Sequence, residues 1–363
     1  MIEPFVIDVP GAELGELRRR ILATRWPDDV ADDWQRGTAP STLRRLLDYW
    51  AGEFDWGAVQ ARLNEHDHVR FVDDDGARVH AMLAGDPDAP PLLLLHGWPD
   101  SFLRFEELIP LLGEQFRLII PSIPGYGFSD RPTVPGAGPD VIADRMARLM
   151  SALGHPVFGV HGGDIGSGIA DHLAARHPER VTGVHFTSVP SAKALTLDPA
   201  VLTADETAWL ADLARWNAEE GAYAALQRTK PQTLAAGLND SPAALASWFL
   251  EKFRAWSDHQ GSEDLLALFG LERLATNATL YWVTGTAGSA ARYYYDARLV
   301  GAAGSLSARV GVAIFPADIA PAPRSIAERF YRVERWTELP RGGHFDGWEQ
   351  PELLADELRA FFS

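Results

Sequence analysis

The chain has 363 residues and a formal net charge of −17, with 46% hydrophobic residues, 23% charged residues and no cysteine. The excess of carboxylates repels phosphate backbones and anionic lipids, so binding to nucleic acid or to a membrane surface is disfavoured. The lack of cysteine excludes disulfides, thiolate metal ligands and thiol catalysis. A chain of this length and composition is expected to form one large domain with an insertion, or two domains.

The N-terminal region, residues 1–65, is predicted to be a helical extension that wraps the core. Residues 1–10 lack the basic start and apolar stretch of a signal peptide, and no apolar run is long enough to span a bilayer. We therefore expect a soluble cytoplasmic protein. From residue 6 to about residue 64 the pattern is helical and rich in tryptophan and arginine, most clearly over residues 14–24 and 43–53.

Strands dominate residues 66–190. Residues 69–72 and 78–83 flank Asp73-Asp74-Asp75-Gly76, which predicts a hairpin turn. Continuous aliphatic runs are typical of strands buried on both faces of a parallel sheet. They occur at residues 91–95, 117–120, 157–160 and 181–186. Because residues 141–153 have helical periodicity between two of these runs, we predict an α/β fold with a mainly parallel sheet flanked by helices.

Residues 191–299 are predicted to form a helical cap inserted into the sheet domain. This region has little strand pattern and carries many aromatic side chains, most of which are expected to pack between cap and core. The strand pattern returns at residues 309–315 and 331–337, and a closing helix is expected over residues 351–362. Residues 66–190 and 300–363 thus form the predicted sheet domain.

Asp164 lies at a strand-to-helix turn, within Gly162-Gly163-Asp164-Ile165-Gly166. The α/β-hydrolases hold their nucleophile at such a turn, where glycines permit a strained backbone. A carboxylate there can attack an sp³ carbon and become a covalent ester. The alternative is that Asp164 only caps the following helix, and the motif alone does not decide between the two.

The loop His96-Gly97-Trp98-Pro99 follows the strand over residues 91–95. In α/β-hydrolases this loop and the residue after the nucleophile supply the oxyanion hole, which would here be the N–H groups of Trp98 and Ile165. His96 and Pro99, together with Ile165, are expected to line the substrate pocket. A second glycine-rich loop, residues 125–129, is assigned a structural role.

Hydrolysis of an ester on Asp164 requires a base and an acid that orients it. In the chain order nucleophile, acid, histidine, His344 is the histidine that follows the last strand on a glycine-rich loop. Asp318 ends the preceding strand and is the favoured acid, with Asp296 and Asp346 as competitors. His172 and His177, on the helix after the nucleophile, are expected to be solvated or capping residues.

Activation of an ether oxygen requires a proton donor, and tyrosine suits this role because its hydroxyl stays protonated, with an ordinary pKa near ~10. The cap region holds five candidates, and the residue pattern does not choose between them: Tyr223, Tyr281, Tyr293, Tyr294 and Tyr295.

The chain resembles the epoxide hydrolases of the microsomal type, which carry a long N-terminal extension before an α/β-hydrolase core. The resemblance runs nearly end to end. It rests on Thr24-Arg25-Trp26-Pro27, Asp48-Tyr49-Trp50, Phe54-Asp55-Trp56, Arg62-Leu63-Asn64, residues 96–102, residues 229–233, Asp240-Ser241-Pro242, residues 250–253 and residues 341–345.

The resemblance implies that Asp164 is the nucleophile, Asp318 the acid, His344 the base, and Tyr223 and Tyr294 the two ring-opening tyrosines. It also implies a small-molecule epoxide and water as the reactants, no metal and no other cofactor, and conversion of an apolar or aromatic epoxide to a vicinal diol. It leaves the assembly state open, a homodimer included. Ile165 departs from the family pattern, which usually has tryptophan at this position, so we expect Ile165 to affect substrate preference.

Two alternatives remain at this point. A haloalkane dehalogenase-like enzyme would use the same nucleophile without ring-opening tyrosines, although Ile165 offers no indole to bind a halide. A catalytically silent binding protein would use the pocket without turnover, and the complete set of reactive residues argues against it.

Overall fold

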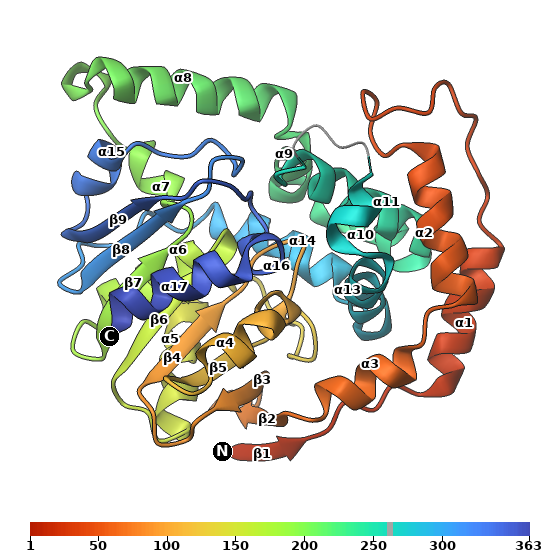
Figure 1. The fold of residues 1–363 in the computed structure, drawn as a ribbon, viewed down its shortest axis with the longest axis horizontal. Coiled ribbons are helices and arrows are strands. Elements are labelled where there is room, and N and C mark those ends of the chain that lie inside the picture. Colours follow the sequence, from red (N-terminus) through yellow and green to blue (C-terminus); the bar gives the residue numbers. More distant parts are fainter. Residues whose placement is uncertain (260–263) are drawn as a thin grey trace.

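A nine-stranded sheet organises the described part of the chain. The computed structural model describes residues 1–259 and 264–363, and its strands lie in the order β1-β2-β3-β5-β4-β6-β7-β8-β9 (Figure 1). They are β1 (Ile2–Phe5), β2 (Asp67–Val72), β3 (Arg78–Gly85), β4 (Pro91–Leu95), β5 (Arg117–Pro121), β6 (Phe158–Gly162), β7 (Val181–Phe186), β8 (Arg309–Ile314) and β9 (Val333–Glu338).

The sheet is parallel from β5 to β9 and antiparallel from β1 to β5. The aliphatic runs of β4 and β5 are almost wholly buried, as predicted for central parallel strands. The predicted hairpin also forms, since the Gly76 N–H donates to the Asp73 carbonyl between β2 and β3. Loops at the carboxyl ends of β4, β6, β8 and β9 therefore meet at one edge.

Strand β1 was not predicted. Its four residues pair antiparallel with β2 and form the edge of the sheet. Such a short edge strand is hard to recognise from periodicity, because only the two end residues of Ile2–Phe5 are partly buried. The extension therefore begins in the sheet before it becomes helical.

Helices cover both faces of the sheet (Figure 1). Helices α4 (Ile109–Leu112) and α17 (Pro351–Phe362) pack together on one face, and α5 (Pro139–Ala152) and α6 (Ile165–Arg176) pack together on the other. The observed bounds of α5 and α17 agree with the predicted helices to within two residues. The short elements around them are the 3₁₀ helices η1 (Phe102–Leu108) and η2 (Pro199–Val201), and α7 (Ser191–Ala194), α15 (Arg324–Glu328) and α16 (Asp346–Glu349).

The cap is helical, as predicted. Its helices are α8 (Ala204–Glu219), α9 (Ala222–Thr229), α10 (Pro231–Asp240), α11 (Pro242–Ala255), α12 (Leu265–Phe269), α13 (Leu271–Thr284) and α14 (Ala287–Ala297). Helices α9 and α10 both pack on α14, and α11 packs on α13. No helix of the described residues is long and apolar enough to cross a membrane.

The helices of the N-terminal extension pack against the cap. They are α1 (Gly11–Leu22), α2 (Pro40–Gly52) and α3 (Trp56–Leu63), and α2 packs against α11 and α13. The buried Trp50 indole on α2 donates to Thr279 Oγ1 of α13 at 2.7 Å. The apolar face of α2 is therefore directed to the cap.

Candidate active site

Asp164 stands at a strained turn between β6 and α6. Its backbone has φ 51° and ψ −125°, a conformation that residues with a side chain rarely adopt. A Cβ on Gly166 would lie 2.1 Å from the Leu95 carbonyl oxygen, so only glycine permits this close approach of helix and strand. The Asp164 N–H donates to Ser188 Oγ at 3.0 Å, which fixes the turn against the end of β7.

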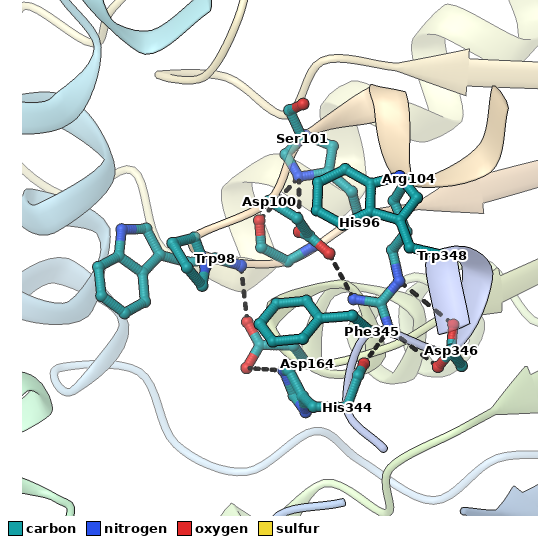
Figure 2. A network of polar contacts seen from close by, with 12 residues as sticks. His96, Trp98, Asp100, Ser101, Arg104, Asp164, His344, Phe345, Asp346 and Trp348 are labelled. Atoms are coloured by element: carbon teal, nitrogen blue, oxygen red, sulfur yellow. Dashed lines mark hydrogen bonds and ion pairs between the residues drawn. The ribbon is translucent and has the colours of Figure 1, made fainter. Parts of the chain in front are cut away.

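The Asp164 carboxylate does not cap its helix. It accepts no capping hydrogen bond from α6, and instead Oδ1 accepts the Trp98 N–H at 2.9 Å (Figure 2). Burial acts to raise the pKa of Asp164, but the nearby charge of His344 and the N–H groups of Trp98 and Ile165 hold it below its ordinary value. The two proposed oxyanion-hole donors thus face this carboxylate, which is ionised at neutral pH.

His344 lies between two carboxylates. Its Nδ1 is 2.6 Å from Asp318 Oδ1, and its Nε2 is 3.3 Å from Asp164 Oδ2, close enough for an ion pair but not aligned for a hydrogen bond. Burial acts to lower the pKa of His344, but the charges of Asp318 and Asp164 raise it to about 10. The resting site therefore holds an imidazolium between two carboxylates.

Backbone contacts hold the base and acid loops together. The Ala317 N–H donates to the Gly342 carbonyl at 3.0 Å, next to Asp318 and His344. The His344 N–H donates to the carbonyl of Trp256, at the end of cap helix α11, at 2.8 Å. Of the competing acids, Asp346 pairs with Arg104 rather than with the His344 ring.

Tyr223 on α9 and Tyr294 on α14 lie side by side above the sheet edge. Their ring centroids are 5.9 Å apart in a T-shaped arrangement. The Trp98 ring stacks on Tyr223 at 5.1 Å with an interplanar angle of 4°. Burial raises the pKa of both phenols above the ordinary value, so both stay protonated at neutral pH.

The other tyrosine candidates have different surroundings. The Tyr281 hydroxyl donates to the Asp100 carbonyl at 2.7 Å, and Tyr295 is 36% exposed and lies beside Arg298. Tyr293 is buried, but like Tyr281 and Tyr295 it does not line the cavity at Asp164. The structure thus brings together with Asp164 the same two tyrosines that the resemblance selected.

A cavity of about 260 Å³ lies between the sheet edge and the cap. It is lined by Asp164, Asp318 and His344, by Tyr223 and Tyr294, and by apolar side chains that include Trp209, Leu213, Trp216 and Ile319. A larger groove of about 1350 Å³, lined in part by residues 130–137 and 229–233, contains none of the five reactive residues. We therefore assign the smaller cavity to the substrate.

The prediction that His96, Pro99 and Ile165 line the substrate pocket is corrected, because none of them lines this cavity. His96 is fully buried, and its Nε2 accepts the Ile123 N–H at 3.1 Å. The Pro99 carbonyl accepts from Asn277 of α13 at 2.8 Å, and Ile165 is 8% exposed. These side chains support the loop at residues 96–99 and the strand-to-helix turn at Asp164, which is the nucleophile elbow. The walls of the cavity come mainly from the cap and from residues 314–322.

His177 was expected to be a solvated or capping residue, and it is the C-cap of α6, where its backbone N–H donates to the Leu173 carbonyl. Its Nε2 also pairs with Asp144 at 2.8 Å. Among residues 1–259 and 264–363, no group of three or more histidine, aspartate and glutamate side chains is arranged to hold a metal ion.

Sequence reasoning missed the residues that support the reactive ones. Ser188 accepts the Asp164 N–H, and Arg104 bridges Asp100 and Asp346 beneath the site. Glu349 accepts N–H groups from both Gly343 and Phe345, on either side of His344. The four-residue spacing of Asp100 and Arg104 was the signal available for one of these contacts.

The mainly parallel sheet, the elbow and the inserted cap define an α/β-hydrolase. Residues 90–306 match the family described as "alpha/beta hydrolase fold", and residues 2–105 match "Epoxide hydrolase N terminus". Rabbit (Oryctolagus cuniculus) epoxide hydrolase 1 is 32% identical, over 99% of this chain and 88% of its own length. The chain therefore belongs to the epoxide hydrolase family.

Solved structures agree with this assignment. The crystal structure of juvenile hormone epoxide hydrolase from the silkworm Bombyx mori superimposes with a TM-score of 0.88 at 30% identity, covering 100% of this chain and 94% of that one. The Aspergillus niger epoxide hydrolase structure gives a TM-score of 0.84 at 26% identity, covering 100% and 96%. The chain is a hydrolase of the class that acts on ether bonds.

Proposed function

We propose that this protein converts an apolar or aromatic epoxide to a vicinal diol through an alkyl ester on Asp164. One observation carries the proposal: a buried, ionised carboxylate, a histidine oriented by a second carboxylate and two buried phenols all line one cavity. The carboxylate supplies a nucleophile, the phenols supply proton donors, and the histidine supplies the base for a second step.

In the first step a carboxylate oxygen of Asp164 attacks one epoxide carbon, and the bond from that carbon to the epoxide oxygen breaks. The oxygen leaves as an alkoxide that takes a proton from the Tyr223 and Tyr294 pair, and the phenol is reprotonated from solvent. The high pKa of both phenols keeps the donor proton in place until the alkoxide forms.

In the second step the ester is hydrolysed. Ester formation removes the negative charge of Asp164, one of the two charges that raise the pKa of His344, so the imidazolium releases its proton more readily. Neutral His344 then takes a proton from water, and the hydroxide attacks the Asp164 carbonyl. The N–H groups of Trp98 and Ile165 stabilise the oxyanion. The acyl C–O bond breaks, the diol leaves with the proton returned by His344, and the Asp164 carboxylate is restored.

Turnover of a panel of epoxides tests this proposal. The panel contains aryl and alkyl epoxides of graded size, together with juvenile hormone, which the name of the silkworm relative indicates as its substrate. We expect vicinal diols to form, with faster turnover of apolar and aromatic members because tryptophans line the cavity. Turnover no faster than the rate in buffer across the whole panel would contradict the proposal, and chloroalkanes serve as the control for halide release.

The cellular setting is part of the same proposal. We propose that the protein acts in the cytoplasm without a nucleic-acid or membrane partner, which the net charge of −17 supports. Light scattering on the purified protein determines whether it is a homodimer, and fractionation of the source cells tests the location.

A further inference from the structure

Arg104 is a charged side chain in the interior of the protein. It lies on η1, is 1% exposed and sits beneath the nucleophile elbow, where a Cβ on Gly163 would lie 3.0 Å from its Nη2. Its Nη1 donates to Asp100 Oδ2 at 2.6 Å, and its Nη2 donates to Asp346 Oδ2 at 2.8 Å. The same Nη2 donates to the His344 carbonyl at 2.5 Å (Figure 2).

Stability alone is a weak explanation for this cluster. Asp100 and Asp346 are, like Arg104, almost fully buried, so three charged groups have lost their hydration. Apolar side chains of similar volume often stabilise a core as well as such a cluster does, because desolvation offsets the attraction. A guanidinium offers something that apolar packing does not, namely several donors in a fixed planar arrangement.

Those donors connect two loops that act on the same chemical step. Asp100 Oδ1 accepts the Gly97 N–H at 3.0 Å, directly before Trp98, whose own N–H donates to Asp164. On its other side Arg104 holds the backbone of His344 itself. The loops follow β4 and β9, and these strands are separated in the sheet by β6, β7 and β8. Strand pairing therefore does not join the two loops directly, whereas Arg104 does.

We propose that Arg104 is a positioning residue that sets the separation between the Trp98 N–H and the imidazole of His344. The inference rests on the proposed ester route. Hydrolysis of the ester requires both groups at once, because water must lie between His344 and a carbonyl whose oxygen points at the oxyanion hole. Ring opening depends more on Tyr223 and Tyr294, and the side-chain hydrogen bonds of Arg104 in the described chain go to Asp100, Asp346 and His344.

Rapid-quench mass spectrometry of the Asp164 peptide measures the two steps separately. We compare the wild type with Arg104→Met and Arg104→Lys, using the fastest epoxide of the panel. Arg104→Met is expected to slow ester hydrolysis about 10²-fold, because a displacement of about 1 Å costs that much, while ring opening changes about threefold or less. The ester then accumulates. Arg104→Lys keeps a charge but loses the planar arrangement, so it should recover hydrolysis only in part.

Arg335→Met is the matched control. Arg335 forms a two-point pair with the largely buried Glu357 at 2.7 and 2.8 Å, between β9 and α17, so its loss also leaves a buried carboxylate unpaired. It should leave the ratio of the two rate constants unchanged. If Arg104→Met does not fold, the variant that combines it with Asp100→Asn and Asp346→Asn removes the unpaired charges and is measured instead.

The outcomes separate this inference from the proposed function. If the wild type forms no ester on Asp164, the proposed function fails. If the ester forms in the wild type and hydrolyses at the same rate in the foldable Arg104 variant, only the inference about Arg104 is wrong. A smaller fraction of active protein with both rate constants unchanged would show a merely structural role and would also overturn it.

Discussion

The reactive groups come from two regions that are held in different ways. Asp164, Asp318 and His344 stand on loops at the carboxyl ends of β6, β8 and β9, and hydrogen bonds among the loops at this edge of the sheet fix them. Tyr223 and Tyr294 stand on cap helices, where aromatic contacts surround them, including those with Trp98 and Trp256. We call these sets the sheet half and the cap half.

The two halves differ in the kind of reactive group that they hold. The sheet half contains the charged groups, which need directional hydrogen bonds to be stable when buried. The cap half contains neutral donors, for which apolar surroundings are favourable because they keep the phenols protonated. Substitutions of Asp318 and His344 in the sheet half should therefore slow ester hydrolysis, loss of Asp164 should stop both chemical steps, and substitutions in the cap half should affect ring opening alone.

The largest expected effect is that of Asp164→Ala. This change removes the nucleophile, so we expect turnover to fall by a factor on the order of 10⁴–10⁶. No ester should be found on the elbow peptide by mass spectrometry. Diol formation at more than a tenth of the wild-type rate would mean that water attacks the epoxide directly and that Asp164 does not form a covalent ester.

The next largest effect is expected for His344→Gln, which should stop the reaction at the ester. Loss of a general base slows such a step about 10²–10⁴-fold, while ring opening continues. The intact mass of the protein should therefore increase by one substrate mass during the first turnover. Unmodified protein after a full equivalent of diol would contradict the assigned role of His344.

The wild-type pH profile gives a related test. Because Asp318 and Asp164 together raise the pKa of His344 to about 10, loss of the Asp164 charge in the ester must bring that pKa down. Hydrolysis needs neutral His344, so its rate should rise with pH through this lower pKa and then level off. Ring opening needs ionised Asp164, whose pKa is lowered, so it should persist to more acidic pH. Identical profiles for the two steps would contradict the account.

Tyr223→Phe and Tyr294→Phe test the cap half. Each leaves one phenol to donate, so we expect about a tenfold or larger loss in each single variant and about 10²–10⁴-fold in the double variant. The loss should lie in ring opening, with the rate of ester hydrolysis unchanged. Tyr293→Phe is the matched control, since Tyr293 adjoins Tyr294 but does not line the cavity. Equal effects of all three single changes would mean that packing, rather than proton donation, is being measured.

The smallest effect is expected for Trp50→Phe, which weakens the attachment of the extension to the cap. It removes the 2.7 Å hydrogen bond to Thr279 in a buried setting, which should lower the free energy of unfolding by about 1 kcal/mol. Urea unfolding measures that loss. The rate of ring opening should stay close to wild type. A large loss of ring opening would show that α2 fixes the tyrosines directly.

The sheet half could be predicted from the sequence, and the cap half only in part. Buried strands are recognisable as aliphatic runs, and the rule that polar loops follow their carboxyl ends led to Asp164, Asp318 and His344. Helical periodicity does not tell which cap face meets the core, so the choice among five tyrosines required the resemblance. The cavity walls were predicted wrongly from residues near the elbow, because they come from distant segments.

The supporting contacts were not predicted, and only the four-residue spacing of Asp100 and Arg104 gave a signal for one of them. Asp100, Arg104 and Asp346 are charged, and a charged residue is expected at the surface unless its partner is known. Asp346, one of the partners of Arg104, lies 242 residues away along the chain. The burial of some histidines was also not predicted. His161 on β6 and His185 on β7 are fully buried, and their ring nitrogens pair at 3.1 Å.

A single turnover in ¹⁸O-labelled water tests the covalent route most directly. Excess enzyme is mixed with an epoxide, and both the diol and the peptide that contains Asp164 are weighed by mass spectrometry. The account predicts one ¹⁸O atom in the Asp164 carboxylate and none in the first diol, because the second oxygen of the diol comes from the aspartate. Label in the diol and none in Asp164 would contradict it.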